Sequence, residues 1–214
     1  LDTARGEVHS TRLVGATGGL SIPKIGASDF GYRLAKQFGH RIVDTRPALV
    51  PLTFDPAGWA PFSALAGLSL PVHIETGSGK TAGRFDEDLL FTHRGLSGPA
   101  ILQISSYWRG GQPITLDLLP GRDLAAELIA AKSGGRRQVG NVLAATIPSR
   151  LAEAWLAEQA DFAARPLADA RDRDLQALAA RLQGWSLVPS GTEGYRKAEV
   201  TAGGVDTREL SSQT

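Results

Sequence analysis

The spacing of apolar residues changes twice along this 214-residue chain, and this change limits the possible folds more than any other feature. Between His40 and Leu119 the apolar stretches are short, contain β-branched residues and are bounded by proline or glycine, which is typical of strands. From Gly121 to Gln183 apolar residues recur every three or four positions, which predicts helices. After Gly184 the chain is extended again. The sequence therefore predicts an α+β fold.

Individual helices and strands are expected where an apolar pattern is flanked by residues that cap helices or form turns. A helix should begin at Ser28 or Asp29, whose side chain can cap it, and end at Gly39. Another should follow Pro99 over 100–108, with proline in its first turn. Strands are expected at 8–14, 41–43, 48–54, 70–76, 114–118, 185–188 and 198–201. Between 40 and 119, long helices are disfavoured by Pro47, Pro51, Pro56, Pro61 and Pro71.

Residues 77–81, with the sequence Gly-Ser-Gly-Lys-Thr, look like a phosphate-binding loop. The complete loop pattern needs glycine where Ile74 stands, so the pattern fails. The related dinucleotide fingerprint needs a helix directly after the loop, and residues 83–88 have no helical apolar face. We therefore predict a surface hairpin turn that binds no nucleotide phosphate.

Charge and residue usage give further expectations about partners. The chain has 23 basic and 22 acidic residues, so its net charge of +1 offers no reason to expect nucleic acid or an anionic membrane as partner. It has no cysteine, which excludes disulfides and cysteine-ligated metals, and its four histidines are scattered, so no metal site is expected. No apolar run is long enough to cross a membrane. We expect a cytoplasmic protein.

The densest polar cluster is the segment 91–99, which contains His93, Arg94 and Ser97 just before the helix expected at Pro99. A helix N-terminus attracts anions, so His93 and Arg94 are candidates for contact with a substrate. In the alternative interpretation, the segment has only a structural role: Ser97 caps the helix and His93 is an ordinary polar residue. Both interpretations stay open.

Several long motifs resemble those of one protein family. Residues 13–32, which include Ala16-Thr17-Gly18-Gly19, are similar to a segment of bacterial NAD(P)/FAD-dependent flavoproteins of the aminoacetone oxidase-like kind. Segments 47–52, 91–99 and 199–210 resemble further motifs of that family, in the same order. The resemblance implies an FAD-binding α/β domain interrupted by a β-barrel-like unit and a small helical bundle. It divides the chain into FAD-domain edge (1–39), β-rich unit (40–119), helical unit (120–184), returning strands (185–201) and return to the FAD domain (202–214).

The same resemblance implies which residues lie near the cofactor. Thr17, Gly18 and Gly19 would form a strand-end turn beside FAD, and Gly203 and Gly204 a return turn near the flavin. The segments that grip most of FAD would precede and follow this chain, so the chain alone is not expected to hold FAD. It would be an inactive internal fragment of a FAD-dependent oxidoreductase that acts on a small molecule. NAD(P)H would be a further cofactor, and the rest of the same chain its partner.

Two other functions remain as alternatives. A β-barrel with a helical bundle could be a non-enzymatic module that binds peptide or nucleic acid, although the balanced charge argues against nucleic acid. A nucleotide-binding role of residues 77–81 is disfavoured by Ile74. The absorbance spectrum of the full-length protein would separate these functions, because a bound flavin absorbs visible light.

Overall fold

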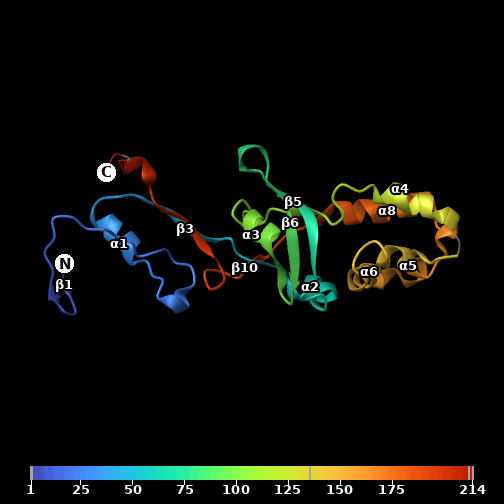
Figure 1. Ribbon diagram of the computed structural model, residues 1–214, viewed down its shortest axis with the longest axis horizontal. Coiled ribbons are helices and arrows are strands. Elements are labelled where there is room, and N and C mark those ends of the chain that lie inside the picture. The colour runs from blue at the N-terminus through green and yellow to red at the C-terminus, as the bar shows by residue number, and fades with distance from the viewer. Residues whose placement is uncertain (1, 135, 212, 214) are drawn as a thin grey trace.

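The computed structural model describes residues 2–134, 136–211 and 213, and it shows an elongated molecule (Figure 1). A sheet lies in the middle and a group of helices at one end, while both chain termini lie at the other end. The helices are α1 (Phe30–Gln37), α2 (Pro56–Ser63), α3 (Pro99–Ser105), α4 (Leu124–Ala130), α5 (Val139–Ala144), α6 (Ser149–Leu156), α7 (Ala160–Ala163) and α8 (Asp172–Gln183). The strands are β1 (Asp2–Thr3), β2 (Gly6–Glu7), β3 (Ile42–Ala48), β4 (Leu52–Thr53), β5 (Ser69–Thr76), β6 (Gly83–Thr92), β7 (Gly95–Ser97), β8 (Ile114–Asp117), β9 (Trp185–Leu187), β10 (Gly191–Thr192) and β11 (Val200–Val205). Single 3-10 turns are η1 (Pro23–Ile25), η2 (Gly79–Thr81), η3 (Ala131–Gly134), η4 (Ala157–Gln159), η5 (Leu167–Asp169) and η6 (Thr207–Glu209).

The central sheet contains seven antiparallel strands in the order β10-β4-β7-β6-β5-β8-β9. Strand β5 pairs with β6 along its full length. Along β5, Leu70, Val72 and Ile74 are buried and alternate with more exposed residues, as expected for a strand with one face on the core. The sheet therefore provides the framework on which the neighbouring helices pack.

A tight turn joins β5 to β6 at residues 77–82. Gly77 has a φ of 70°, and a Cβ atom there would lie 2.7 Å from the carbonyl oxygen of Thr81, so the turn needs glycine. Turn η2 has only three residues and leads directly into β6. The predicted hairpin turn is confirmed, and no helix follows the loop.

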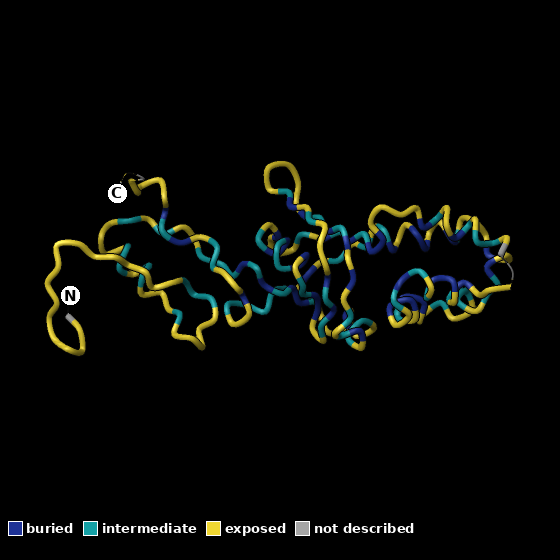
Figure 2. The backbone as a smooth tube through the Cα atoms, in the orientation of Figure 1, coloured by how far each residue is buried: buried dark blue, intermediate teal, exposed yellow. Residues whose placement is uncertain are grey.

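The helices bury one side each against the sheet or against one another. Helix α3 packs on β5 and β6 through the fully buried Ile101 and Ile104. Helix α4 packs on α8 and α5 on α6, and Figure 2 shows that buried segments lie along the inner sides of these pairs. In α8, Leu175, Leu178 and Leu182 are buried at helical spacing, which confirms the predicted apolar face. One continuous apolar core runs from the sheet into these helices.

A separate two-stranded ribbon, β3 with β11, leads from the central sheet toward the end that carries both termini (Figure 1). The two strands are antiparallel, with Ala48 opposite Val200, and the register shifts between Ala202 and Gly204. Helix α1 packs against both strands. This end is thus built from residues near the start and near the end of the sequence.

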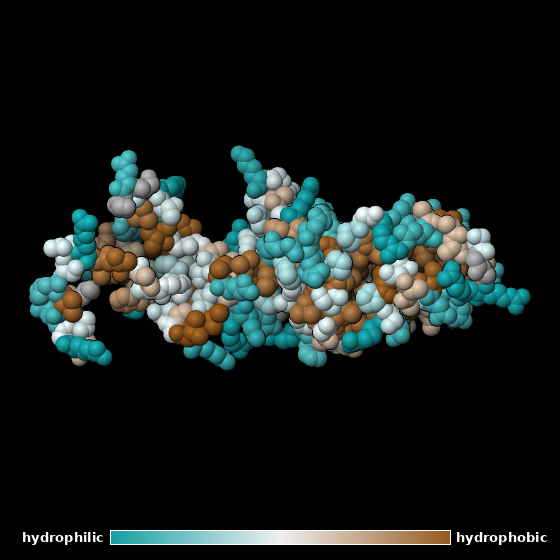
Figure 3. All heavy atoms as spheres, in the orientation of Figure 1, coloured by the Kyte–Doolittle hydropathy of each residue, from teal (hydrophilic) through white to brown (hydrophobic). Residues whose placement is uncertain are grey.

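The same end exposes large apolar side chains (Figure 3). Val14 is 87% exposed, Ile25 79% and Phe38 68%. Figure 3 shows several groups of hydrophobic atoms at this end, separated by more polar ones.

The elements confirm the predicted α+β class, but one local prediction is wrong and two elements were not predicted. Residues 8–14 are not a strand, since no strand in the described part of the chain pairs with them. Helix α2 forms in a proline-rich stretch where none was expected, because Pro56 suits its first turn and Asp55 caps the N–H groups of Ala57 and Gly58. Strand β6, the longest, was not anticipated. The division of the chain into five units remains a prediction.

Candidate functional site

The two turns expected beside a flavin lie next to each other. The N–H of Leu20 donates to Oγ1 of Thr201 over 2.9 Å, and the hydroxyl of Ser21 lies 3.1 Å from the same oxygen. Thr201 belongs to β11, which also carries the second turn. These hydrogen bonds therefore hold the segment directly after residues 17–19 against β11.

Close approach of the backbone explains the glycines in both turns. A Cβ atom on Gly19 would lie 3.1 Å from the hydroxyl of Tyr32, and one on Gly204 would lie 3.2 Å from the ring of the same residue. Gly203 has a φ of 84°, and a Cβ there would overlap the carbonyl oxygen of Asp44. Tyr32, on α1, is thus the common neighbour of the two turns.

Thr17 and Gly18 form the exposed side of this arrangement. A Cβ on Gly31 would overlap Oγ1 of Thr17, so that hydroxyl lies directly against α1. Gly18 has a φ of 70° and open space around its α-carbon, which leaves its main chain accessible to a ligand. These features leave the main chain at residues 17–18 open to a ligand, and contact with a flavin there stays a prediction. They do not form a phosphate site, because the adjacent helix α1 has the acidic Asp29 at its N-cap.

Asp206 fixes the end of β11 and was missed by sequence reasoning. It is 5% exposed, and its Oδ2 accepts hydrogen bonds from Nη2 of Arg208 (2.6 Å) and Nη2 of Arg41 (2.5 Å). Bonds from the side chain and backbone of Arg208, and then from Arg41, hold the pKa of Asp206 well below its ordinary value. Arg41 lies 165 residues earlier in the sequence, so no local motif signals this cluster.

His93 and Arg94 lie in the turn between β6 and β7, and both are exposed. The Arg94 guanidinium forms an ion pair with Glu193 at 3.2 Å. Both candidates line a pocket of about 380 Å³ whose apolar wall includes Phe54 and Trp59. The pocket thus offers a ligand a guanidinium and an imidazole beside Phe54, while Trp59 is only 2% exposed.

The predicted cap of the next helix is wrong. Gly98, not Ser97, is the N-cap of α3, and it makes no side-chain hydrogen bond. Strand β7 separates His93 and Arg94 from this helix, so neither residue lies at the helix N-terminus. The structure also does not join this pair to the glycine turns, since the pocket with His93 lies at α2 while the turns lie at α1 (Figure 1).

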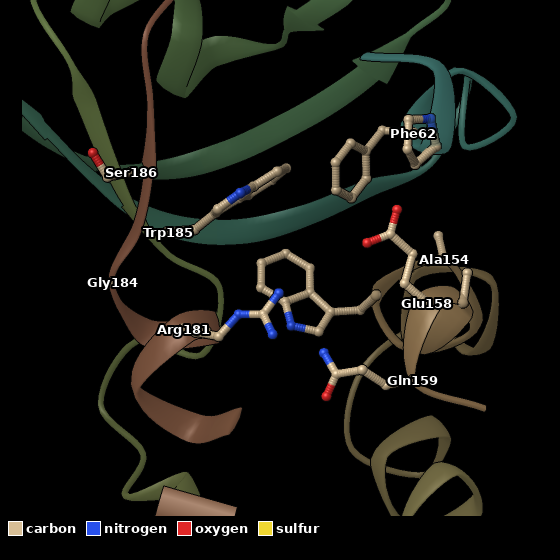
Figure 4. A pocket seen from close by; sticks show the side chains of 11 residues that line it. Phe62, Ala154, Glu158, Gln159, Arg181, Gly184, Trp185 and Ser186 are labelled. Carbon is tan, nitrogen blue, oxygen red and sulfur yellow. The ribbon is translucent and has the colours of Figure 1, made fainter. Parts of the chain in front are cut away.

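A third site, which we call the aromatic cavity, lies where the central sheet meets the helices (Figure 4). Its volume is about 400 Å³. The rings of Trp155 and Trp185 meet edge to face with centroids 5.0 Å apart, and Phe62 lies 5.0 Å from Trp185. Its polar lining comes from Glu158, Gln159 and Arg181. Sequence reasoning missed this site because the three aromatic residues are far apart in the chain.

Within the described ranges, no group of three or more His, Cys, Asp or Glu side chains is arranged to hold a metal ion. None of the helices in those ranges combines the length and hydrophobicity that crossing a bilayer requires.

Comparison with known proteins identifies the family. The family model described as "HI0933-like protein barrel and H2TH domain" matches residues 46–200, well over half of the chain. The chain belongs to this HI0933-like family. One relative of this HI0933-like chain is the "Ribosomal RNA dihydrouridine synthase" of Escherichia coli (strain K12), 47% identical over 210 residues. Another is the protein of the same name from Haemophilus influenzae (strain ATCC 51907 / DSM 11121 / KW20 / Rd), 42% identical over 214 residues.

Both matches cover 97% of the HI0933-like chain, but they cover only 51% and 52% of the relatives. The chain therefore spans about half the length of these proteins. Membership of the family agrees with the expected relationship to flavoproteins at a coarse level. The finer designation as aminoacetone oxidase-like is not the one that the relatives carry, since both are named as enzymes acting on ribosomal RNA.

These names overturn one expectation about partners. Nucleic acid was excluded on the basis of a net charge of +1, and this exclusion is wrong, because both relatives are named for action on ribosomal RNA. Net charge was a poor guide because proteins recognise folded RNA largely through shape and through stacking on unpaired bases.

Proposed function

We propose that this chain is the RNA-facing half of a flavin-dependent oxidoreductase that reduces uridine in ribosomal RNA. The observation that carries the proposal is the 47% identity, over 97% of the chain, to a protein named as a ribosomal RNA dihydrouridine synthase. Sequence similarity of this extent covers the glycine turns, the sheet and the helical end alike.

The reaction adds two hydrogens to the uracil ring. The C5–C6 double bond becomes a single bond when one carbon accepts a hydride and the other a proton. Reduced FAD would supply the hydride, with NAD(P)H as the compatible source of electrons. A group near the pyrimidine would supply the proton.

In this proposal, two parts of the chain have separate tasks. Thr17, Gly18 and Gly203 would contact one edge of the flavin through their exposed main chain, while Gly19 and the buried Gly204 would hold these segments against Tyr32. His93 and Arg94 would contact the RNA at the mouth of their pocket, away from the uridine that is reduced, where a guanidinium can hold a phosphate and an imidazole can hydrogen-bond to the RNA.

The test is the dihydrouridine content of ribosomal RNA. Deleting the gene for the full-length protein should remove one dihydrouridine from ribosomal RNA, seen by mass spectrometry as the loss of a nucleoside that carries two extra hydrogens. Returning the gene should restore it, and the purified protein should show a flavin absorbance spectrum. Unchanged dihydrouridine in the deletion strain would contradict the proposal.

A second arm tests the site residues. Arg94→Gln should lower dihydrouridine formation by about 10-fold or more, because a charge-assisted contact to a phosphate is lost. Arg84→Gln, an exposed arginine in β6 that pairs with Glu75 at 3.2 Å and lies outside the pocket, is the matched control. Equal activity of the two variants would show that Arg94 has no part in the reaction.

A further inference from the structure

The aromatic cavity has the composition of a surface that stacks a flat ring. Phe62 and Trp185 are half-buried, and Trp155 is 7% exposed. The guanidinium of Arg181 lies 5.8 Å from the centroid of the Trp155 ring. Aromatic rings and arginine planes are the groups on which proteins stack unpaired nucleobases. The volume of about 400 Å³ falls within the range of about 300–1,000 Å³ that is typical of ligand pockets.

One polar atom of the site has no hydrogen-bond partner among the described residues. The indole Nε1 of Trp155 is buried and has no hydrogen-bond acceptor among the described residues. A buried donor without a partner is costly, and in a native structure it calls for an explanation. This nitrogen lies beneath the cavity surface, so a ligand carbonyl would reach its N–H, and remove the cost, once the side chains above it shift.

The charges around the cavity favour a neutral ligand. Arg181 contributes one positive charge and Glu158 one negative charge, so the lining carries no net charge. Figure 4 shows both side chains, with Gln159, directed toward the same space. The Gln159 amide can both donate and accept, which suits the edge of a base, whereas the carboxylate of Glu158 would repel a phosphate.

We propose that the aromatic cavity binds one unpaired nucleobase of the RNA substrate, at a distance from the uridine that is reduced. The proposal rests on the proposed function for its ligand class. Helices α6 and α8, which contribute Trp155 and Arg181, lie at the opposite end of the molecule from α1 and the glycine turns (Figure 1). The base held there would anchor the RNA and set which nucleotide reaches the flavin.

Fluorescence of a base analogue tests this directly. The probe is a single-stranded RNA of about 12 nucleotides, within the site sizes of single-strand binding modules, that carries one 2-aminopurine. Its fluorescence falls when the base stacks. The comparison RNA has the same backbone but lacks the base at that position. The full-length protein should bind the base-containing RNA about 10-fold more tightly, because stacking of a single base commonly contributes at least this much.

Two variants and one control test whether the aromatic cavity causes the difference in affinity between the two RNAs. Trp155→Phe removes the indole N–H, and Arg181→Gln removes the guanidinium, so each should bring the affinity ratio of the two RNAs close to one. Arg173→Gln makes the same change of charge on the exposed side of α8, outside the cavity, and should leave the ratio unchanged. The Arg181 side chain is exposed, so its variant remains informative if Trp155→Phe fails to fold.

Each other outcome overturns the proposal. Equal affinity for both RNAs, a ratio that survives Arg181→Gln, or no binding of either RNA would each show that the cavity does not hold a base. Dihydrouridine formation, measured with the same preparation, distinguishes failure of the base-binding proposal from failure of the proposed function. Reduction of ribosomal RNA without base-dependent binding would reject the cavity alone, and absence of reduction would reject the proposed function as well.

Discussion

At the scale of single residues, Gly203 combines a left-handed backbone with lack of space. Its φ is 84°, and a Cβ would overlap the carbonyl oxygen of Asp44 on the facing strand. Gly203→Ala should therefore lower the free energy of unfolding by roughly 2–4 kcal/mol. Gly111 has a φ of 82° but open space around it, so Gly111→Ala should cost only about 1 kcal/mol. Denaturant unfolding of both variants checks this, and equal losses would mean that the contact with Asp44 is relieved at little cost.

Asp206 should make the free energy of unfolding depend on pH in the acidic range. Its pKa is lowered in the folded state, so its contribution to stability is complete above about pH 4, the ordinary aspartate value, and is lost as the pH falls toward the folded value. Asp206→Asn should therefore be less stable at neutral pH and should lose less stability on acidification. Asp29→Asn, which removes an exposed pair with Arg33, is the control and should change little. Denaturation midpoints of wild type, Asp206→Asn and Asp29→Asn, measured from neutral to acidic pH, test this prediction. Parallel curves of midpoint against pH for wild type and Asp206→Asn would contradict it.

At the scale of elements, the β5–β6 hairpin should not bind nucleotides. Phosphate loops bind through N–H groups at the start of a helix, and here a three-residue turn leads straight into a strand. Calorimetric titration with ATP should show no binding either to the wild type or to Lys80→Ala. Saturable binding by the wild type that disappears in Lys80→Ala would show that the loop binds nucleotide phosphate after all.

The elements also show which structural features could be predicted from sequence. The strand over 70–76 and helix α8 were predictable because their buried positions repeat at a fixed period. Strand β6 was not, because its middle residues Asp86, Glu87 and Asp88 are exposed acids that hide the alternation. The stretch 8–14 has a suitable pattern but gains no partner strand, and a strand needs one to satisfy its backbone.

The candidate sites follow the same distinction. The glycine pairs at 18–19 and 203–204 could be singled out because each is a short contiguous motif, and the structure places Gly19 and Gly204 beside Tyr32. Neither pair forms the predicted turn, since Gly203 and Gly204 lie within strand β11 and no strand precedes Thr17, and their role beside a flavin stays a prediction. The aromatic cavity was not, because Phe62, Trp155 and Trp185 meet only through the packing of α2, α6 and β9. Sites that assemble from distant segments leave no local pattern in the sequence.

At the scale of the whole molecule, the chain by itself should not retain FAD. The turns at Gly18 and Gly203 offer main chain to one edge of a ligand but no helix N-terminus to neutralise a pyrophosphate. Titrating FAD into the purified 214-residue chain should show no tight binding, whereas the full-length protein should bind it. Micromolar or tighter binding by the 214-residue chain would mean that the cofactor site lies within it.

The pairing of Ala48 with Val200 has a consequence for how such proteins diversify. Everything between these residues leaves the ribbon and returns to it at adjacent points, so a host protein would meet the intervening 151 residues through just two neighbouring junctions. Segments whose ends lie close together are those that proteins gain and exchange most readily. The body that carries the sheet and the aromatic cavity can thus be exchanged between related proteins as one unit, without any change in the ribbon from which it leaves and to which it returns.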